Sequence, residues 1–312
     1  EIEVKIIFES VGDGYFNFAP FKALANLNLN NSFSPLIHDL GTITIPLGVF
    51  VLHFIFYSII GTYSFITLEF FFIIFFLIIF YRITRLIDLN RIQSLTIAII
   101  LLNIPNIFQI LNIYNLEYFN IIYAEFYSLR FPRPIVSNIL LYLFIFIILK
   151  NEKKNFFTKK NSIVLGILSS LLFTSYFHAF FLLQIVLIFY LFYKFRFNLF
   201  QILKTKYNYI LLYVLTFLLV SSLFFINMFF ADADFLQRNG LVVFNLDKKL
   251  IILKHLFFKL FKIQFLFLLF LSFFLLFIFN KRINLIGFKK INILFIIFYS
   301  SIVTPFIFIF IS

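Results

Sequence analysis

Asp13 is the first residue in this chain whose type and setting suggest chemistry. It lies between Gly12 and Gly14 at the head of the polar, aromatic-containing stretch GDGYFNFAPFKAL. A carboxylate can take a proton from an acceptor hydroxyl or amine, or hold a metal ion, and flanking glycines let the backbone approach a ligand closely. A solvated aspartate in a Gly-Asp-Gly turn explains the same residues. Asp13 is therefore a candidate catalytic residue with a structural alternative.

Four other polar residues are candidates for binding a phosphate or a substrate. Arg130 and Arg133 lie in SLRFPRP, and Arg238 lies in ADADFLQRNG. Guanidinium groups suit bidentate contact with phosphate. His38, next to an aspartate, is placed to touch a substrate. The alternative for Arg130 and Arg133 is that they anchor a helix end at a lipid headgroup layer, and loop polarity alone explains His38.

Asp232 and Asp234 are the weak candidates for a metal site. Carboxylates two residues apart can share a divalent cation through their oxygen atoms, whereas internal charge pairing in a short acidic loop explains them equally well. The chain has no cysteine, so thiolate metal sites and disulfides are excluded. A divalent metal ion is the one cofactor that these residues suggest, and no cofactor is certain.

The elements that must position these residues follow from the composition. Hydrophobic residues make up 63% of the chain and charged residues 12%, with a mean hydropathy of +1.05. Such values are typical of integral membrane proteins. No alternating pattern of barrel strands is present. The expected fold is therefore all-α, a polytopic transmembrane bundle of about eight spans, located in the inner (plasma) membrane.

Basic clusters indicate the orientation of this bundle. Short Lys- and Arg-rich segments recur through the chain, which has a net charge of +13, and the positive-inside rule places them on the cytoplasmic side. We attribute the charge to orientation rather than to nucleic-acid binding. The chain is expected to be one domain truncated at both ends, with residues 1–62 as an extracytoplasmic loop and residues 63–312 as transmembrane helices. The spans are expected near 63–81, 94–111, 135–149, 162–177, 179–193, 208–230 and 264–279, and from 291 onward.

Residues 46–81 pose a problem of parity, because two crossings there would move Asp13 into the cytoplasm. We expect IPLGVFVLHFIFYSIIG to lie in or dip into the outer interface as a juxtamembrane helix. The segment from residue 63 to residue 81 would then cross alone, after a break at Gly61.

Residues 12–81 resemble the first extracytoplasmic loop and following helix of GT-C glycosyltransferases. In particular they resemble bacterial relatives of dolichyl-phosphate-mannose protein mannosyltransferases and the lipid A aminoarabinose transferase. The matching pieces are Asp13 with GYFNFAPFKAL, then IPLGVFVLHFIFYSIIG, then TYSFITLEFFFIIFFLIIFYRITR. Gly14 stands where that family often has a second acid. The resemblance implies transfer of a sugar from a polyprenyl-phosphate donor to a lipid, glycan or protein acceptor at the extracytoplasmic face, with Asp13 as base or metal ligand.

Two other functions stay open. An O-antigen polymerase or ligase also uses undecaprenyl-linked sugars, although such enzymes carry their large polar loop late in the chain. A transporter or flippase would place ionisable residues at the bilayer midplane, whereas most acids of this chain fall in the loops assigned to the outer side. No nucleotide-binding loop or metalloprotease motif is present. The expected partners are a polyprenyl-phosphate-linked sugar, its acceptor and the lipid bilayer, without nucleic acid.

Overall fold

The computed structural model describes residues 47–110, 134–152, 156–195, 198–229, 245–261 and 288–311, with single residues between 266 and 274. All regular elements in these ranges are helical, which confirms the all-α expectation for this part of the chain. The elements are α2 (Leu47–Ile60), η2 (Gly61–Tyr63), α3 (Ser64–Leu86), α4 (Arg91–Ile110), α6 (Pro134–Lys150), α7 (Lys159–Phe173), α8 (Phe177–Lys194), α9 (Leu199–Val220), α10 (Ser222–Phe229), α12 (Leu246–Leu260) and α14 (Phe288–Ile311).

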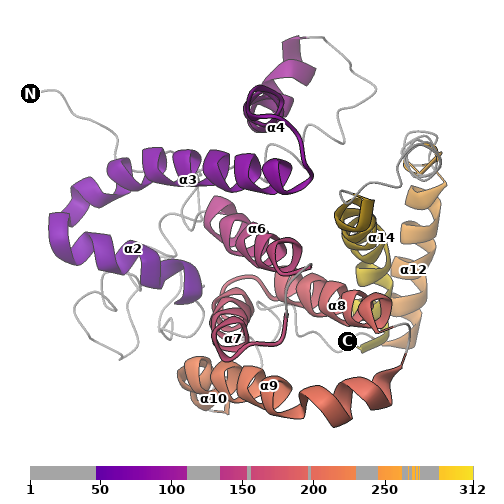
Figure 1. Cartoon of the computed structure of the whole chain (residues 1–312). Coiled ribbons are helices and arrows are strands. Elements are labelled where there is room, and N and C mark those ends of the chain that lie inside the picture. Colours follow the sequence, from indigo (N-terminus) through magenta and orange to yellow (C-terminus); the bar gives the residue numbers. More distant parts are fainter. Residues whose placement is uncertain are drawn as a thin grey trace, which may run out of the picture.

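The predicted break at Gly61 is present. Gly61 has a φ of 61°, a left-handed conformation that residues with a Cβ avoid, and it opens the 3-10 turn between α2 and α3. Figure 1 shows the two helices joined at this bend, on the left of the view. The two expected segments at 162–177 and 179–193 are separate helices joined by a turn, since α7 ends at Phe173 and α8 begins at Phe177.

The prediction of a polytopic bundle of about eight spans, and with it the multi-pass inner-membrane localisation, is wrong. Among the residues that the structure describes, no helix combines the length and the apolar character that a membrane crossing requires. Segments predicted as spans at 135–149 and 162–177 form α6, with 17 residues, and α7, with 15 residues. Both are shorter than the roughly 20 residues that cross the hydrocarbon layer as a helix.

Side chains at three helix starts explain where those helices begin. The Asn90 Oδ1 accepts a hydrogen bond from the Gln93 backbone N–H at 2.8 Å, and the Gln93 side chain accepts one from the Asn90 N–H at 3.2 Å. Thr158 and Asn198 cap α7 and α9 in the same way, at 3.1 Å each. These bonds satisfy backbone donors that the first helical turn leaves unpaired.

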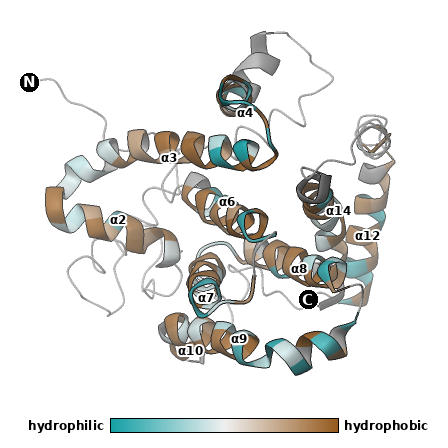
Figure 2. Ribbon diagram, in the orientation of Figure 1, coloured by the Kyte–Doolittle hydropathy of each residue, from teal (hydrophilic) through white to brown (hydrophobic). Residues whose placement is uncertain are grey.

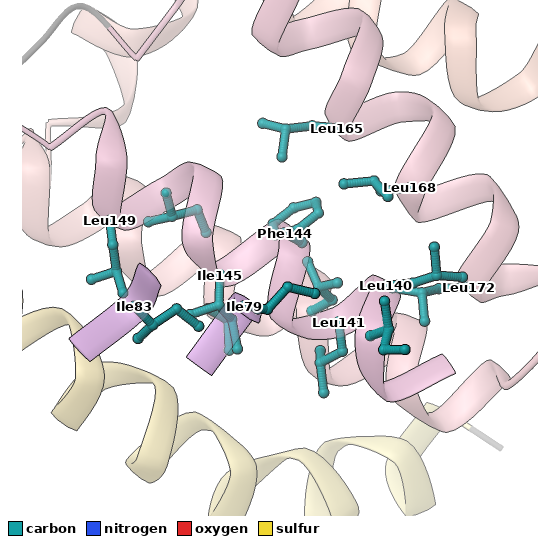
Figure 3. Close-up of a cluster of buried hydrophobic side chains, with 14 of the residues drawn as sticks. Ile79, Ile83, Leu140, Leu141, Phe144, Ile145, Leu149, Leu165, Leu168 and Leu172 are labelled. Atoms are coloured by element: carbon teal, nitrogen blue, oxygen red, sulfur yellow. The ribbon is translucent and has the colours of Figure 1, made fainter. Parts of the chain in front are cut away.

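The apolar core lies where α3, α6 and α7 meet, and Figure 3 shows its side chains converging from these helices. α6 is apolar around most of its circumference and lies between neighbours, packing along α3, α7 and α8. Phe144 and Ile148 of α6 and Phe76 of α3 are fully buried. Aromatic residues extend this packing, since the Phe76 ring meets the Tyr142 ring edge to face, with centroids 5.7 Å apart.

α7 and α9 approach each other closely because α7 presents a glycine there. A Cβ added at Gly166 would lie 2.9 Å from the Tyr213 carbonyl oxygen and 2.9 Å from the Thr216 Cβ, both in α9. Real Cβ atoms do not come that close, and one of the two contacts is backbone that cannot rotate away. Gly166 therefore sets the distance between these two helices.

Replacing Gly166 with alanine should lower the free energy of unfolding by about 1–2 kcal/mol, because relief of the clash would force α7 and α9 apart and outweigh the gain in helix propensity. Thermal unfolding followed by helical circular dichroism tests this. Gly61→Asn is the control, since nothing lies within 4 Å of a Cβ added at Gly61 and asparagine tolerates the left-handed region. Equal stability of Gly166→Ala and the natural chain would contradict the close approach.

Candidate functional site

The residues that the sequence singled out for catalysis, phosphate binding and metal binding all lie outside the described residues. They are Asp13, His38, Arg130, Arg133, Asp232, Asp234 and Arg238. The structure therefore neither brings them together nor separates them. Among the residues that it does describe, no group of three or more potential metal ligands is present.

α3 has two apolar faces, of which the core covers only one. Its inward face is buried and includes Leu68, Phe72 and Phe76. Its outward face is an apolar row spaced by one, three or four residues, whose members are 47–66% exposed. We call this row the outer stripe of α3; it consists of Phe70, Phe71, Ile74, Phe75 and Ile78.

The outer stripe ends in cations. Arg82 and Arg85 lie on the same outward side of α3, one and two turns beyond Ile78, and both are exposed. Figure 2 shows the change from brown to teal toward the C-terminal end of α3. The Arg85 guanidinium donates a hydrogen bond to the Leu89 carbonyl in the turn that follows. The outer side of α3 thus presents apolar surface along the row and positive charge at its end.

A compact polar cluster joins the end of α8 to the segment after α6. The Tyr190 hydroxyl donates to the Glu152 Oε2 at 2.9 Å, and the Lys194 ammonium donates to the Tyr190 oxygen at 3.0 Å and to the Glu152 carbonyl at 3.3 Å. Lys194 also forms an ion pair with the Glu152 carboxylate at 3.8 Å. The ring of Phe156 covers the cluster, with its centroid 5.8 Å from the ammonium.

Burial controls the protonation of this cluster. Tyr190 is completely buried, and its pKa is strongly raised, first by burial and then by the charge and the hydrogen bond of Glu152. Burial lowers the pKa of Lys194, against the opposing attraction of Glu152. The side chains of Lys194 and Glu152 are only 21% and 8% exposed. The tyrosine therefore stays neutral and acts as the hydrogen-bond bridge between two partly buried charges.

Three helices share a second polar cluster, formed by Ser169 of α7, Gln184 of α8 and Tyr213 of α9. The Tyr213 hydroxyl donates to the Gln184 Oε1 at 2.9 Å, and the Gln184 amide donates to the Ser169 Oγ at 3.3 Å. The Ser169 and Tyr213 oxygens are 2.8 Å apart. If Ser169 is the donor in that last pair, each group donates once and accepts once around a closed ring. Burial raises the pKa of Tyr213.

Sequence reasoning missed both clusters. Lys194 lies in one of the basic segments that the positive-inside rule assigns to the cytoplasmic side, and Glu152 stands among lysines at positions 150, 153 and 154. The signal that was available is a Tyr and a Lys four residues apart at the end of an apolar helix, which places both side chains on one face. In both clusters the polar groups are bonded mainly to one another. Each therefore connects helices rather than presenting a reactive group.

Comparisons of the chain with protein-family models, with curated proteins and with solved structures give no match.

Tyr190 should make the protein sensitive to alkali. Below pH 10 the phenol is neutral in both states, and above its ordinary pKa of 10.0 only the unfolded chain releases the proton. The free energy of unfolding should therefore fall by about 1.4 kcal/mol per pH unit for this group. The lowered pKa of Lys194 makes the free energy of unfolding rise with pH, but only below about pH 10.4, where lysine in the unfolded chain is still protonated.

Tyr190→Phe should remove that slope between about pH 10.5 and 11.5, as measured by denaturant unfolding at a series of pH values. The same change at Tyr207, which is 57% exposed, is the matched control and should leave the slope unchanged. An unaltered alkaline slope in Tyr190→Phe would mean that the phenol is not held protonated by its surroundings.

Proposed function

We propose that this chain acts at a lipid surface and transfers a sugar from a polyprenyl-phosphate donor to an acceptor. The observation that carries the lipid part of this proposal is the outer stripe of α3. Five large apolar side chains in a row, each at least 47% exposed, form a patch of the kind that marks an interaction site. Arg82 and Arg85 at its end favour an anionic lipid surface over an apolar protein partner.

The sugar-transfer part rests on the resemblance of residues 12–81 to GT-C glycosyltransferases. The described portion of that segment, α2 followed by the bend at Gly61 and by α3, supports it, because the family has a helix ending in glycine ahead of the helix that leads to the arginines. In this proposal Asp13 takes the proton from the acceptor or holds a divalent metal ion. Arg130, Arg133 and Arg238 are its partners for the phosphate that leaves.

Asp13→Asn should reduce transfer by a factor of about 10²–10⁴, the usual contribution of a general base. The measurement is incorporation of label from a panel of polyprenyl-phosphate sugars by the protein mixed with lipid vesicles that contain the donor. Asp247→Asn is the matched control, because Asp247 is an exposed acid in the first turn of α12. Transfer that is equal in the natural protein and in Asp13→Asn would remove Asp13 from the mechanism, and no transfer from any donor would contradict the proposed activity.

A charge placed in the outer stripe should weaken lipid binding. Phe75→Asp should reduce the fraction bound to phosphatidylcholine vesicles by about tenfold or more, since a buried Phe side chain contributes roughly 1.5–3 kcal/mol. Co-flotation with the vesicles measures it. Leu246→Asp is the control, because Leu246 is 75% exposed but is followed by Asp247, Lys248 and Lys249. An equal effect of both substitutions would show that the stripe has no special role.

A further inference from the structure

A groove between α3 and α4 lies beside the end of the outer stripe. It has a volume of about 340 Å³, within the roughly 300–1,000 Å³ range of small-molecule sites. Its walls are Leu77, Ile78, Tyr81, Arg91, Ile92 and Leu95. Four aliphatic side chains form most of this open groove, and Tyr81 and Arg91 add little polar surface to it. The short turn after α3 brings the two helices together, as Figure 1 shows.

The groove suits an occupant that is apolar along its length and anionic at one end. Ile78, Ile92 and Leu95 are 47%, 78% and 46% exposed, so an apolar ligand would cover surface that the fold leaves open. From Leu77 to Leu95, the stretch that holds all six wall residues, the charged residues are Arg82, Arg85, Asp88 and Arg91, an excess of two positive charges. A lipid with a phosphate satisfies both conditions. Its hydrocarbon chain can cover the apolar walls, and its phosphate can meet the excess positive charge of the same short segment.

Packing holds the groove open. The Thr84 hydroxyl in α3 lies 3.4 Å from the Ser94 carbonyl oxygen of α4, at a buried contact. The Asn90 cap fixes the first turn of α4, and that turn contains both Arg91 and Ile92. Arg91 is therefore carried beside the aliphatic walls by the backbone of α4 rather than by a loop.

We propose that this groove binds an anionic lipid, with one hydrocarbon chain along Leu77, Ile78, Ile92 and Leu95 and with its phosphate at Arg91. The inference goes beyond the proposed sugar transfer, because this lipid is bound and not consumed. A guanidinium can contact two phosphate oxygens at once, and the excess positive charge around it favours a headgroup with a net negative charge over a zwitterionic one.

The absence of tryptophan from the chain makes a direct test possible. Tyr81→Trp places a single fluorescent indole in the groove wall, and Tyr207→Trp places one on α9 as the matched control. Each variant is reconstituted in phosphatidylcholine vesicles that contain phosphatidylglycerol, with bromine on the acyl chains of one lipid at a time. Brominated phosphatidylglycerol should half-quench Tyr81→Trp at a mole fraction about tenfold lower than brominated phosphatidylcholine does. Tyr207→Trp should show no such preference.

Adding Arg91→Gln to Tyr81→Trp should abolish the preference, whereas adding Lys204→Gln, which removes an exposed cation from α9, should leave it unchanged. Arg91→Lys keeps the charge and should retain part of the preference, and helical circular dichroism checks that each variant is folded. Inorganic phosphate distinguishes a lipid from a free anion: if millimolar phosphate removes the preference as effectively as the same concentration of unbrominated short-chain phosphatidylglycerol does, the hydrocarbon chain adds nothing and the lipid proposal is overturned. Equal quenching by the two brominated lipids, or persistence of the preference in Arg91→Gln, would also overturn it. The readout is fluorescence and not sugar transfer. Loss of the lipid preference would therefore leave the proposed role of Asp13 in sugar transfer intact, and loss of transfer would leave the lipid site intact.

Discussion

The two-sided apolar character of α3 is the constraint on which the rest of the arrangement depends. A helix that is apolar on one stripe buries that stripe and leaves the other side to water. In α3 the residues Leu68, Phe72 and Phe76 enter the core, while Phe70, Phe71 and Phe75 remain outside. The inner face is covered throughout. On the outer face Phe71 meets Phe56 of α2, with ring centroids 6.2 Å apart, and Ile78 lines the groove shared with α4. Phe70, Ile74 and Phe75 stay 66%, 52% and 51% exposed, and the proposed lipid contact rests on them.

Polar clusters provide the specificity that apolar helices lack. Side chains such as Phe, Leu and Ile pack against one another in many registers at similar free energy, so a core made of them defines helix positions weakly. The ring of Ser169, Gln184 and Tyr213 can close only at one register of α7, α8 and α9, because each oxygen must meet a particular partner. The Glu152–Tyr190–Lys194 cluster does the same for the end of α8. Slipping either contact would leave polar groups buried without bonds, at a cost of about 1–3 kcal/mol for each group.

Much of the helix layout was predictable, whereas its relation to a membrane was not. Apolar runs bounded by basic segments predicted a helix at 135–149, where α6 (Pro134–Lys150) lies, and Gly61 marked the bend. The predicted span at 208–230 is divided at Ser221 between α9 and α10, and an apolar run carries no signal for such a division. Run length did not predict helix ends well either: α3, α4, α6 and α8 each extend beyond the apolar run that predicted them, because basic and polar residues at the ends of the run continue the helix. The two polar clusters could not be predicted, because they depend on pairs 15 to 44 positions apart in the sequence.

α3 and α4 together carry the exposed apolar stripe and a group of positive charges. Ile78 belongs both to the outer stripe and to the wall of the α3–α4 groove, so a surface that contacts the stripe also reaches the groove. Arg82 and Arg85 follow Ile78 on α3, and Arg91 opens α4. All three cations thus lie toward one end of the apolar surface. A lipid layer that covers the stripe can therefore place its headgroups at these arginines, and a single lipid can enter the groove without crossing a polar barrier.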